Sequence, residues 1–424
     1  MDGEILFLSH RIPFPPNRGD KIRSHHILRR LARMAPVHIG CFADDDADLA
    51  EEVELASLGA SYLLRRRSKP LPLAGLQALQ AGKPVSLTAF YDARMAAYVR
   101  DVLASGRIGT IFVFSSQMGQ YLPDSFTGRF IMDFCDVDSA KFEAYAREKR
   151  GLMACIHARE ARLLAAEEAR LAARADASLL ISHKEAELFR SRLSGDMAHG
   201  ARVQVLGNGI ECDTFDPELV DAETRMLKAG EGGPRLIFTG QMDYPPNVAA
   251  VERMARRILP LVQARCPQAS FHIVGRAPTD GVKALAAVEG VHVWGRVEDV
   301  RTWLKASDMA VCPLDIARGV QNKVLEAMAM ELPVVLTSAA ATGINAVPNH
   351  HFAVADSDAG LAAAIIELAA NPRGGTAMGK DARRLVVERQ SWQSALEPLA
   401  GMMAQTPLAR TALAQTALAG RDAA

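Results

Sequence analysis

The sequence predicts an α/β protein made of two doubly wound domains, each a parallel sheet with helices on both faces. At 424 residues the chain is too long for one ordinary core and suits two domains of about two hundred residues each. Short apolar runs without alternation, such as residues 309–314 and 333–337, indicate strands that are buried on both faces. Helical segments separate these strands, which is the pattern of a parallel sheet.

Composition narrows the classes of function. A formal net charge of zero gives no general attraction to nucleic acid, and 6% aromatic residues are too few for base-stacking surfaces. The six cysteines lie far apart without a CxxC pair, so we expect free thiols in a reducing compartment. The acidic N-terminus does not resemble a signal peptide, and no apolar run reaches the length of about eighteen residues that spans a membrane. We therefore expect a cytoplasmic protein.

The first predicted strand covers residues 4–9, and Asp20 is expected to cap a helix over residues 21–34. Gly19 lies in the loop between them. A strand, a glycine-containing loop and a helix start present backbone N–H groups to an anion, although a single glycine is a weak signal. The cations near this predicted anion site are Arg18, Lys21 and Arg23.

Polar side chains follow two further strands, predicted at residues 110–114 and 130–134. Asp136 and Asp138 follow the second of them, and carboxyl ends of parallel strands meet at one edge of a sheet. One carboxylate is therefore interpreted as orienting an acceptor hydroxyl or a donor sugar. Equally, Asp138 or Ser139 can cap the helical region that follows, up to residue 175. No third ligand is spaced to join the two carboxylates, so we expect no metal site.

A basic segment precedes a leucine-rich stretch at residues 71–82. Four cations beside leucines suit peripheral contact with an anionic inner membrane, at roughly 1 kcal/mol per cation. The alternative interpretation is a basic turn beside a core helix. The four cations are Arg65, Arg66, Arg67 and Lys69.

Residues 309–343 combine a strand, a loop, a short helix and another strand. Asn322 is the predicted N-cap of a helix over residues 323–330, and Lys323 and Glu326 lie in its first turns. One interpretation places a phosphate on the helix N-terminus and Lys323, and a sugar hydroxyl on Glu326. In the other, Glu326 complements the helix dipole and Lys323 is a solvated charge.

The segment NKVLEAMAMELPVV resembles the donor-nucleotide helix of the family-4-type retaining glycosyltransferases, which have the GT-B fold. Residues 133–187 resemble the acceptor-side domain of the exosortase-associated (PEP-CTERM) sugar transferases. The segment GNGIECDTFDP resembles the crossing between the two GT-B domains. The resemblance therefore implies an acceptor-side domain over residues 1–207 and a nucleotide-sugar domain over residues 208–387. A helix at about 388–403, with Ser391-Trp392, is expected to cross back, and residues 404–424 are a predicted disordered tail.

This resemblance implies a retaining glycosyltransferase of the hexosyltransferase type. It would move a sugar from a UDP- or GDP-sugar to a glycan or lipid-linked acceptor in exopolysaccharide biosynthesis, without a metal or other cofactor. In such enzymes the departing phosphate is thought to take the acceptor proton, so the protein mainly stabilises the diphosphate. The implied catalytic residues are Arg318, Lys323, Glu326 and Asp136. The implied donor-binding residues are Gly19, Gly240, Gln241, Arg276, Gly295, Val297, Gly319, Val320, Gln321 and Asn322.

Three positions depart from the family pattern. Gln241 stands where many members carry a basic residue, and Arg318 stands in place of the first of two glutamates eight residues apart. Glu331 replaces the glycine that would end the donor helix. Two alternatives therefore stay open, a sugar-nucleotide epimerase of the same fold and a non-catalytic GT-B scaffold.

Overall fold

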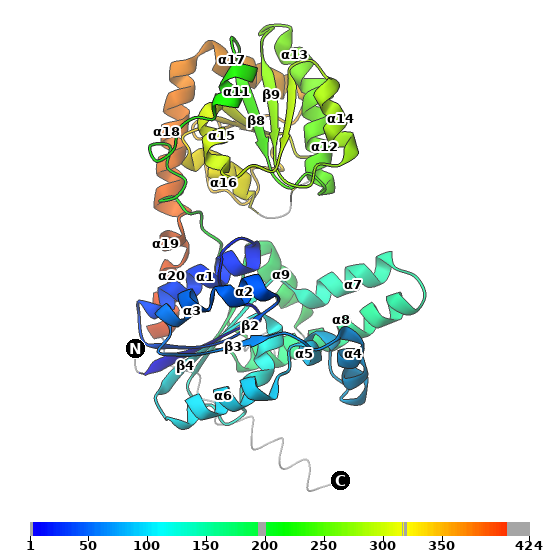
Figure 1. Cartoon of the computed structure of the whole chain (residues 1–424), viewed down its shortest axis with the longest axis vertical. Coiled ribbons are helices and arrows are strands. Elements are labelled where there is room, and N and C mark those ends of the chain that lie inside the picture. Colours follow the sequence, from blue (N-terminus) through cyan, green and yellow to red (C-terminus); the bar gives the residue numbers. More distant parts are fainter. Residues whose placement is uncertain (1–2, 194–200, 316, 318–319, 405–424) are drawn as a thin grey trace. The chain divides into compact units, whose positions relative to one another are not determined.

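The computed structural model describes residues 3–193, 201–315, 317 and 320–404 (Figure 1). The chain divides into two compact units, which we call unit 1 (Met1–Asn208 with Leu396–Ala424) and unit 2 (Gly209–Ala395). The boundary inferred from the sequence, between residues 207 and 208, lies one residue from this division.

Unit 1 contains a seven-stranded parallel sheet of order β3-β2-β1-β4-β5-β6-β7. The chain runs from β1 outward to β3 and then returns, so that β4 pairs with the other side of β1. The carboxyl ends of β1 and β4 therefore flank a switch point, where open α/β sheets bind ligands. The strands are β1 (Glu4–Ser9), β2 (Val37–Ala43), β3 (Ser61–Arg66), β4 (Ile108–Phe114), β5 (Arg129–Cys135), β6 (Ala177–Leu180) and β7 (Val203–Val205).

The helical region that follows β5 is two helices rather than one. α7 and α8 form a hairpin (Figure 1), and the break falls at Gly151, whose φ of 64° lies in the left-handed region. The C-terminal helix α20 belongs to unit 1. The α-helices of unit 1 are α1 (Gly19–Ala32), α2 (Asp46–Ala50), α3 (Glu52–Leu58), α4 (Leu71–Gln80), α5 (Val85–Ala89), α6 (Ala93–Ala104), α7 (Asp138–Glu148), α8 (Leu152–Arg174), α9 (His183–Arg192) and α20 (Glu397–Ala404).

Unit 2 contains a six-stranded parallel sheet of order β10-β9-β8-β11-β12-β13. Its order reverses in the same way, between β8 and β11. Apolar side chains from both faces of this sheet form the core of the unit, which explains why the strands read as continuous apolar runs. The strands are β8 (Arg235–Thr239), β9 (Ser270–Val274), β10 (Val291–Gly295), β11 (Met309–Cys312), β12 (Val334–Leu336) and β13 (Ala353–Val354).

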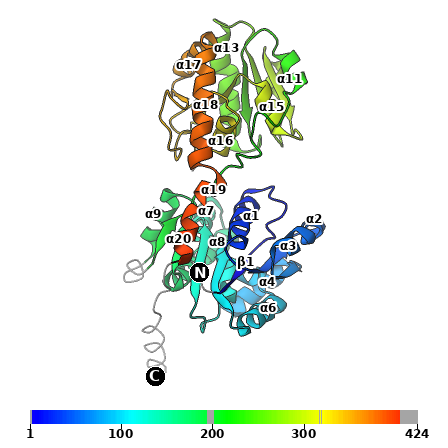
Figure 2. The same cartoon turned by 90° about the vertical axis from the view of Figure 1, so that its left-hand side faces the viewer.

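The helices of unit 2 cover both faces of its sheet, and α18 runs along the unit (Figure 2). The helix expected over residues 248–264 is longer and contains a π-helical turn at Met254–Ile258. The helices are α11 (Thr224–Ala229), α12 (Pro245–Arg253), α13 (Leu259–Gln263), α14 (Asp280–Ala284), α15 (Val300–Ala306), α16 (Asn322–Ala329), α17 (Asp358–Ala370), α18 (Pro372–Arg389) and α19 (Trp392–Ala395).

The predicted N-caps of α1 and α16 are wrong. α1 begins at Gly19 after Arg18, and the Asp20 carboxylate accepts a hydrogen bond from Arg11 at 2.6 Å. α16 begins at Asn322 itself after Gln321, without a side-chain cap. In α1 the Asp20 carboxylate bonds to Arg11 of the preceding loop and therefore does not cap the helix.

Neither residue proposed to cap α7 does so. Asp138 is the first helical residue, and Val137 precedes it without a side-chain cap. The Ser139 N–H and hydroxyl both donate to Glu168, at 2.9 and 2.5 Å. A carboxylate of α8 therefore accepts both hydrogen bonds of Ser139.

Glu331 ends α16 in the left-handed conformation that glycine usually adopts, with φ of 59°. The N–H of Leu332 donates to Ala327 O at 3.0 Å and the N–H of Glu331 to Met328 O at 3.1 Å, the Schellman arrangement. The neighbouring helix α18 requires a glycine where it packs against this turn. A Cβ on Gly379 of α18 would lie 1.9 Å from Glu331 O. Close packing of α18 on this turn thus accommodates the departure from the family pattern.

Candidate active site

Two glycines shape the carboxyl edge of the unit 2 sheet at its switch point. Gly240 follows β8 with φ of 153°, and Gly275 follows β9 with φ of 157°. A Cβ on Gly275 would lie 1.6 Å from Gly240 O, and a Cβ on Gly240 would lie 3.0 Å from Lys323 Nζ. Glycine at both positions lets the two backbones meet and leaves room for the lysine.

Lys323 lies at this edge with neutral partners. Its Nζ donates to Asn247 Oδ1 at 2.6 Å and lies 4.0 Å from the centroid of the Phe238 ring. Asn247 Nδ2 donates in turn to Gln241 O at 2.9 Å, which fixes the amide orientation. Burial lowers the pKa of Lys323 to about 8. Among the described residues, no carboxylate forms a salt bridge with this amine.

Glu326 lies one turn further along α16 and is partly buried. Burial raises the pKa of its carboxyl group to about 7, and the nearby Lys323 opposes that rise. Within the described ranges the carboxylate has no hydrogen-bond partner. It is therefore free to accept hydrogen bonds from a ligand hydroxyl.

The other predicted donor residues of unit 2 lie at ends of its strands or at the start of α16. Arg276 donates to Gln241 Oε1 at 2.8 Å, and both side chains are exposed. Gly295 O accepts from Gly275 N at 2.8 Å, and Val297 packs on the core. Gln321 precedes α16, Asn322 is its exposed first residue, and Val320 is exposed beside Gly343. Arg318 and Gly319 lie outside the described residues.

Arg253 holds the segment that follows β11, a role that sequence reasoning missed. This buried guanidinium donates to Pro313 O at 3.3 Å and Asp315 Oδ1 at 2.7 Å. It also donates to Asp356 O at 2.6 Å and Asp358 Oδ1 at 2.7 Å. Arg253 thus joins the ends of β11 and β13. No local pattern signals this role, because an arginine on a predicted helix looks like any solvated charge.

A polar cluster lies at the corresponding edge of unit 1. Ser116 Oγ donates to Asp138 at 3.3 Å, and the His10 ring stacks on Phe114 with centroids 5.8 Å apart. Burial lowers the pKa of His10 and raises that of Asp138. Asp136 is exposed, so Asp138 is the carboxylate gathered into this cluster. The sequence argument passed over His10, which the turn after β1 brings here.

Two of the three cations predicted to serve an anion site at the start of α1 are not available to a ligand. Lys21 is 1% exposed and pairs with Asp48, and Arg23 is fully buried and donates to Asp133 at 2.9 Å. Carboxylates of unit 1 neutralise both charges. Gly19 itself is the first residue of α1, with no atom within 4 Å of the position a Cβ would take.

The basic segment belongs to the edge strand β3 and the residues after it, not to a turn. Each of its cations already has a partner within unit 1. Arg65 pairs with Asp92 at 3.5 Å, Arg66 with Asp46 at 2.6 Å and Arg67 with Asp44 at 2.9 Å, and Lys69 donates to Thr88 O at 2.8 Å.

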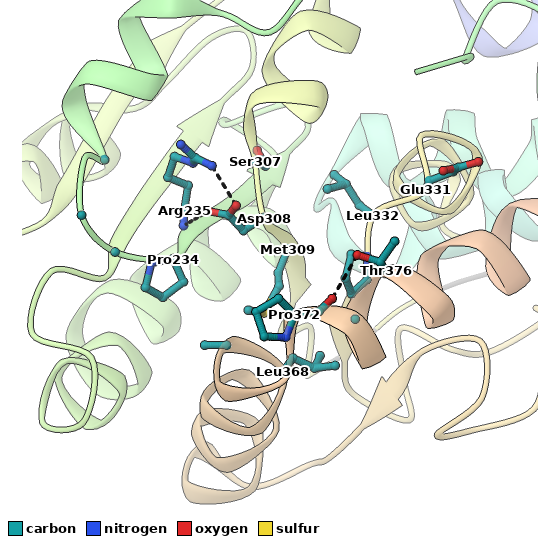
Figure 3. A pocket seen from close by; sticks show the side chains of 16 residues that line it. Pro234, Arg235, Ser307, Asp308, Met309, Glu331, Leu332, Leu368, Pro372 and Thr376 are labelled. Atoms are coloured by element: carbon teal, nitrogen blue, oxygen red, sulfur yellow. Dashed lines mark hydrogen bonds and ion pairs between the residues drawn. The ribbon is translucent and has the colours of Figure 1, made fainter. Parts of the chain in front are cut away.

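A pocket of about 590 Å³ opens at the opposite, amino edge of the unit 2 sheet (Figure 3). Its arginine, Arg235, donates to Asp308 at 2.8 Å, and Glu331 adds a second carboxylate. This lining offers no net positive charge to a diphosphate. Across the described ranges, no group of three His, Cys, Asp or Glu side chains is placed to hold a metal ion. No helix in the described part of the chain is long and apolar enough to cross a membrane.

Comparisons with known proteins agree with this architecture. A family model described as glycosyl transferases group 1 matches residues 233–371. No curated protein matches the chain.

Solved structures resemble the whole chain. Sucrose-phosphate synthase from Thermosynechococcus elongatus is 15% identical with a TM-score of 0.58, over 99% of this chain and 100% of that one. HepE from Anabaena, solved with UDP and glucose, is 14% identical with a TM-score of 0.61, over 95% and 100%. WaaG, a glycosyltransferase of lipopolysaccharide biosynthesis, is 15% identical with a TM-score of 0.57, over 95% and 100%. The predicted GT-B fold is therefore confirmed, and residues 233–371 of unit 2 match the model of glycosyl transferases group 1.

Proposed function

We propose that this protein is a retaining glycosyltransferase of exopolysaccharide biosynthesis. It transfers a sugar from a UDP- or GDP-sugar to a glycan or lipid-linked acceptor, without a metal. The observation that carries the proposal is Lys323, a cation with neutral partners at the carboxyl edge of a group 1 domain. HepE, which shares the fold, was solved with UDP and glucose, and this supports a nucleotide-sugar donor.

The chemistry follows from charge development on the leaving group. As the bond to the sugar breaks, negative charge grows on the departing diphosphate. Lys323 Nζ and the backbone N–H groups at the start of α16 stabilise that charge, and preorganised donors of this kind need no reorganisation during the reaction. The departing phosphate oxygen then accepts the acceptor proton, so no protein nucleophile is needed. Glu326 positions the ribose through hydrogen bonds and does not attack.

The partners of Lys323 suit this role. Asn247 and Phe238 orient the amine without neutralising it, because an amide oxygen and an aromatic face carry no net charge. Burial makes the charged amine costly in the free protein, as its lowered pKa shows. A bound diphosphate compensates that cost.

The polar cluster of unit 1 suits an acceptor that carries hydroxyl groups. Ser116, Gln117 and Asp138 offer hydroxyl, amide and carboxyl groups at the carboxyl ends of β4 and β5. The sequence argument left this orienting role to one of the two carboxylates and counted Asp136 among the catalytic residues; we place Asp138 in the acceptor-orienting role, because Asp138 lies within the cluster. Gly19, exposed at the start of α1, stays a predicted donor-binding residue.

The test is a calorimetric titration of UDP, GDP and ADP against the purified full chain and a Glu326→Ala variant. Removing hydrogen bonds to a charged acceptor costs about 1.5–3 kcal/mol, so we expect about ten- to a hundredfold weaker binding of one preferred nucleotide. Glu331→Gln is the matched control, because Glu331 lies at the other end of α16. Its affinity should equal that of the wild type.

Two outcomes point to the alternative functions. If no nucleotide binds, the chain is a non-catalytic scaffold and the assigned donor residues lose their role. If UDP is released from a UDP-sugar without any acceptor and the free sugar is epimerised, the protein is a sugar-nucleotide epimerase. UDP release that requires an acceptor supports transfer.

A further inference from the structure

The helix α4 has an inverted distribution of apolar side chains. It buries Ala74 and Ala78, whereas its leucines face outward. A surface helix in water normally buries its largest apolar residues. The exposed fractions are 65% for Leu71, 46% for Leu73, 54% for Leu76 and 65% for Leu79. This face therefore calls for a covering partner.

The start of α8 continues the apolar surface. Leu152 is 76% exposed, Met153 50% and Ile156 40%. Arg159 of the same helix donates to Ala78 O at the end of α4, at 2.9 Å. Leu152, Ile156 and Arg159 recur at helical spacing and so share one face of α8. That face extends from α4 toward the α7–α8 turn, and α4 lies beside α8 in Figure 1. We call the four leucines of α4, together with Leu152, Met153 and Ile156 of α8, the apolar surface.

Exposed cations flank the apolar surface. Lys83 follows α4, and Lys149 and Arg150 lie in the α7–α8 turn, separated from Leu152 by Gly151. Within the part of the chain that the structure describes, none of these three forms a salt bridge. They differ in this from the cations of residues 65–69, whose partners are given above. Positive charge is thus available beside the leucines.

We propose that the apolar surface docks on a membrane that contains anionic lipids. Its leucines enter the boundary between head groups and acyl chains, and Lys83, Lys149 and Arg150 contact the anionic head groups. A protein partner explains the exposed leucines equally well, but the flanking cations favour the lipid surface. The proposal rests on the apolar surface alone and does not require the proposed transferase activity.

The chain offers its own probe for the experiment. Cys155 is exposed on α8 between Met153 and Ile156, whereas the other cysteines are buried or partly buried. The full-length protein is labelled at Cys155 with an environment-sensitive fluorophore. It is then titrated with vesicles of phosphatidylcholine and phosphatidylglycerol, and with vesicles of phosphatidylcholine alone. We expect a blue shift with the anionic vesicles, weakened by salt.

Three variants assign the contact. Leu73→Gln/Leu76→Gln/Leu79→Gln should abolish the blue shift and flotation with the vesicles. Lys149→Gln/Arg150→Gln should lower the partition coefficient about thirtyfold, from the known contribution of a cation near an anionic surface. Leu219→Gln/Leu261→Gln is the matched control, because these leucines are exposed on unit 2 at 65% and 44%. All substituted side chains are exposed, so thermal unfolding should stay unchanged.

Other outcomes overturn the proposal. Equal binding to the uncharged vesicles removes the role of the cations, and binding that survives the leucine substitutions removes the role of α4. If no vesicle binds and the leucine variant converts a dimer into a monomer, the apolar surface is a contact between two copies of the chain. UDP affinity is also measured for each variant. Loss of vesicle binding with unchanged UDP affinity then concerns membrane docking alone and not the proposed function.

Discussion

Both units place cations in a helix that starts beside the switch point of the sheet, but they use these cations in opposite ways. In unit 1, Lys21 and Arg23 of α1 are fully buried and pair with Asp48 and Asp133. In unit 2, Lys323 of α16 is partly buried, and among the described residues its hydrogen-bond and ring partners are neutral, although the Glu326 carboxylate lies near enough to act on its charge. Both helices begin at the carboxyl edge of a parallel sheet beside its switch point. The location alone therefore does not identify an anion site.

The two units differ in the net charge of each cation taken together with its partner. A buried cation paired with a carboxylate presents almost no net charge to a ligand, and breaking the pair destabilises the fold. A cation held by an amide and a ring keeps its full charge, which acts strongly in a medium of low dielectric constant. The chemical nature of the partner thus separates a structural cation from a binding one.

The largest expected effect is on stability in unit 1. Arg23→Met leaves Asp133 buried without its cation, and loss of one partner of a buried pair costs about 3–5 kcal/mol. We expect the unfolding transition of unit 1 to move to a lower urea concentration. It is followed by far-ultraviolet circular dichroism of the full chain. Arg18→Met is the control, because this side chain is 44% exposed and its pairs contribute little. Equal stability of both variants would show that the Arg23 pair is not structural.

The second effect is on ligand binding in unit 2. Lys323→Met should weaken nucleotide binding about ten- to a hundredfold, because a hydrogen bond to a charged group is lost. Stability should not fall, since the substitution removes a charge whose burial is unfavourable. A large loss of stability with unchanged affinity would place Lys323 in the same class as Arg23.

The pH dependence provides an independent readout of the same variant. The pKa of Lys323 in the free protein is lowered to about 8, so the amine is charged below that pH and loses its proton above it. A diphosphate binds the charged form, and wild-type affinity should therefore fall as pH rises through about 8. In Lys323→Met this basic limb should be absent.

The sequence predicted the elements of the sheets well and their charge partners poorly. Strands such as β1 and β8 are continuous apolar runs, and their burial on both faces follows from that pattern. Lys323 and Glu326 lie in one short helix, so local spacing sufficed to pair them. Lys21 and Arg23 find their carboxylates 27 and 110 residues away in sequence. Such partners cannot be read from local spacing.

The same limit explains the residues that sequence reasoning missed. Arg253 contacts carboxylates 62 and 105 residues away, and its role follows from where β11 and β13 end. His10 joins Phe114 and Asp138 only because β1, β4 and β5 are adjacent in the sheet. Topology predicts that strand ends meet, but the identity of the side chains that touch depends on packing across the whole unit.

The smallest expected effect comes from converting one arrangement into the other. Asn247→Asp places a carboxylate where the amide oxygen now lies 2.6 Å from Lys323 Nζ, as Asp133 does for Arg23. The amine stays, but its charge is neutralised, so nucleotide affinity should fall about three- to tenfold. The new carboxylate should raise the pKa of Lys323, and the basic limb of the binding profile should move above pH 8.

Asn208→Asp is the matched control for this conversion. Arg23 donates to Asn208 Oδ1 at 2.9 Å, so this substitution adds a carboxylate to a cation that already has one. Nucleotide affinity and its pH profile should stay at wild-type values. Calorimetric titrations of both variants across the pH range compare the two units directly. If Asn247→Asp binds as tightly as the wild type with the basic limb unmoved, the neutral partner of Lys323 is not what makes this helix start a binding site. The backbone N–H groups at the start of α16 would then account for the affinity.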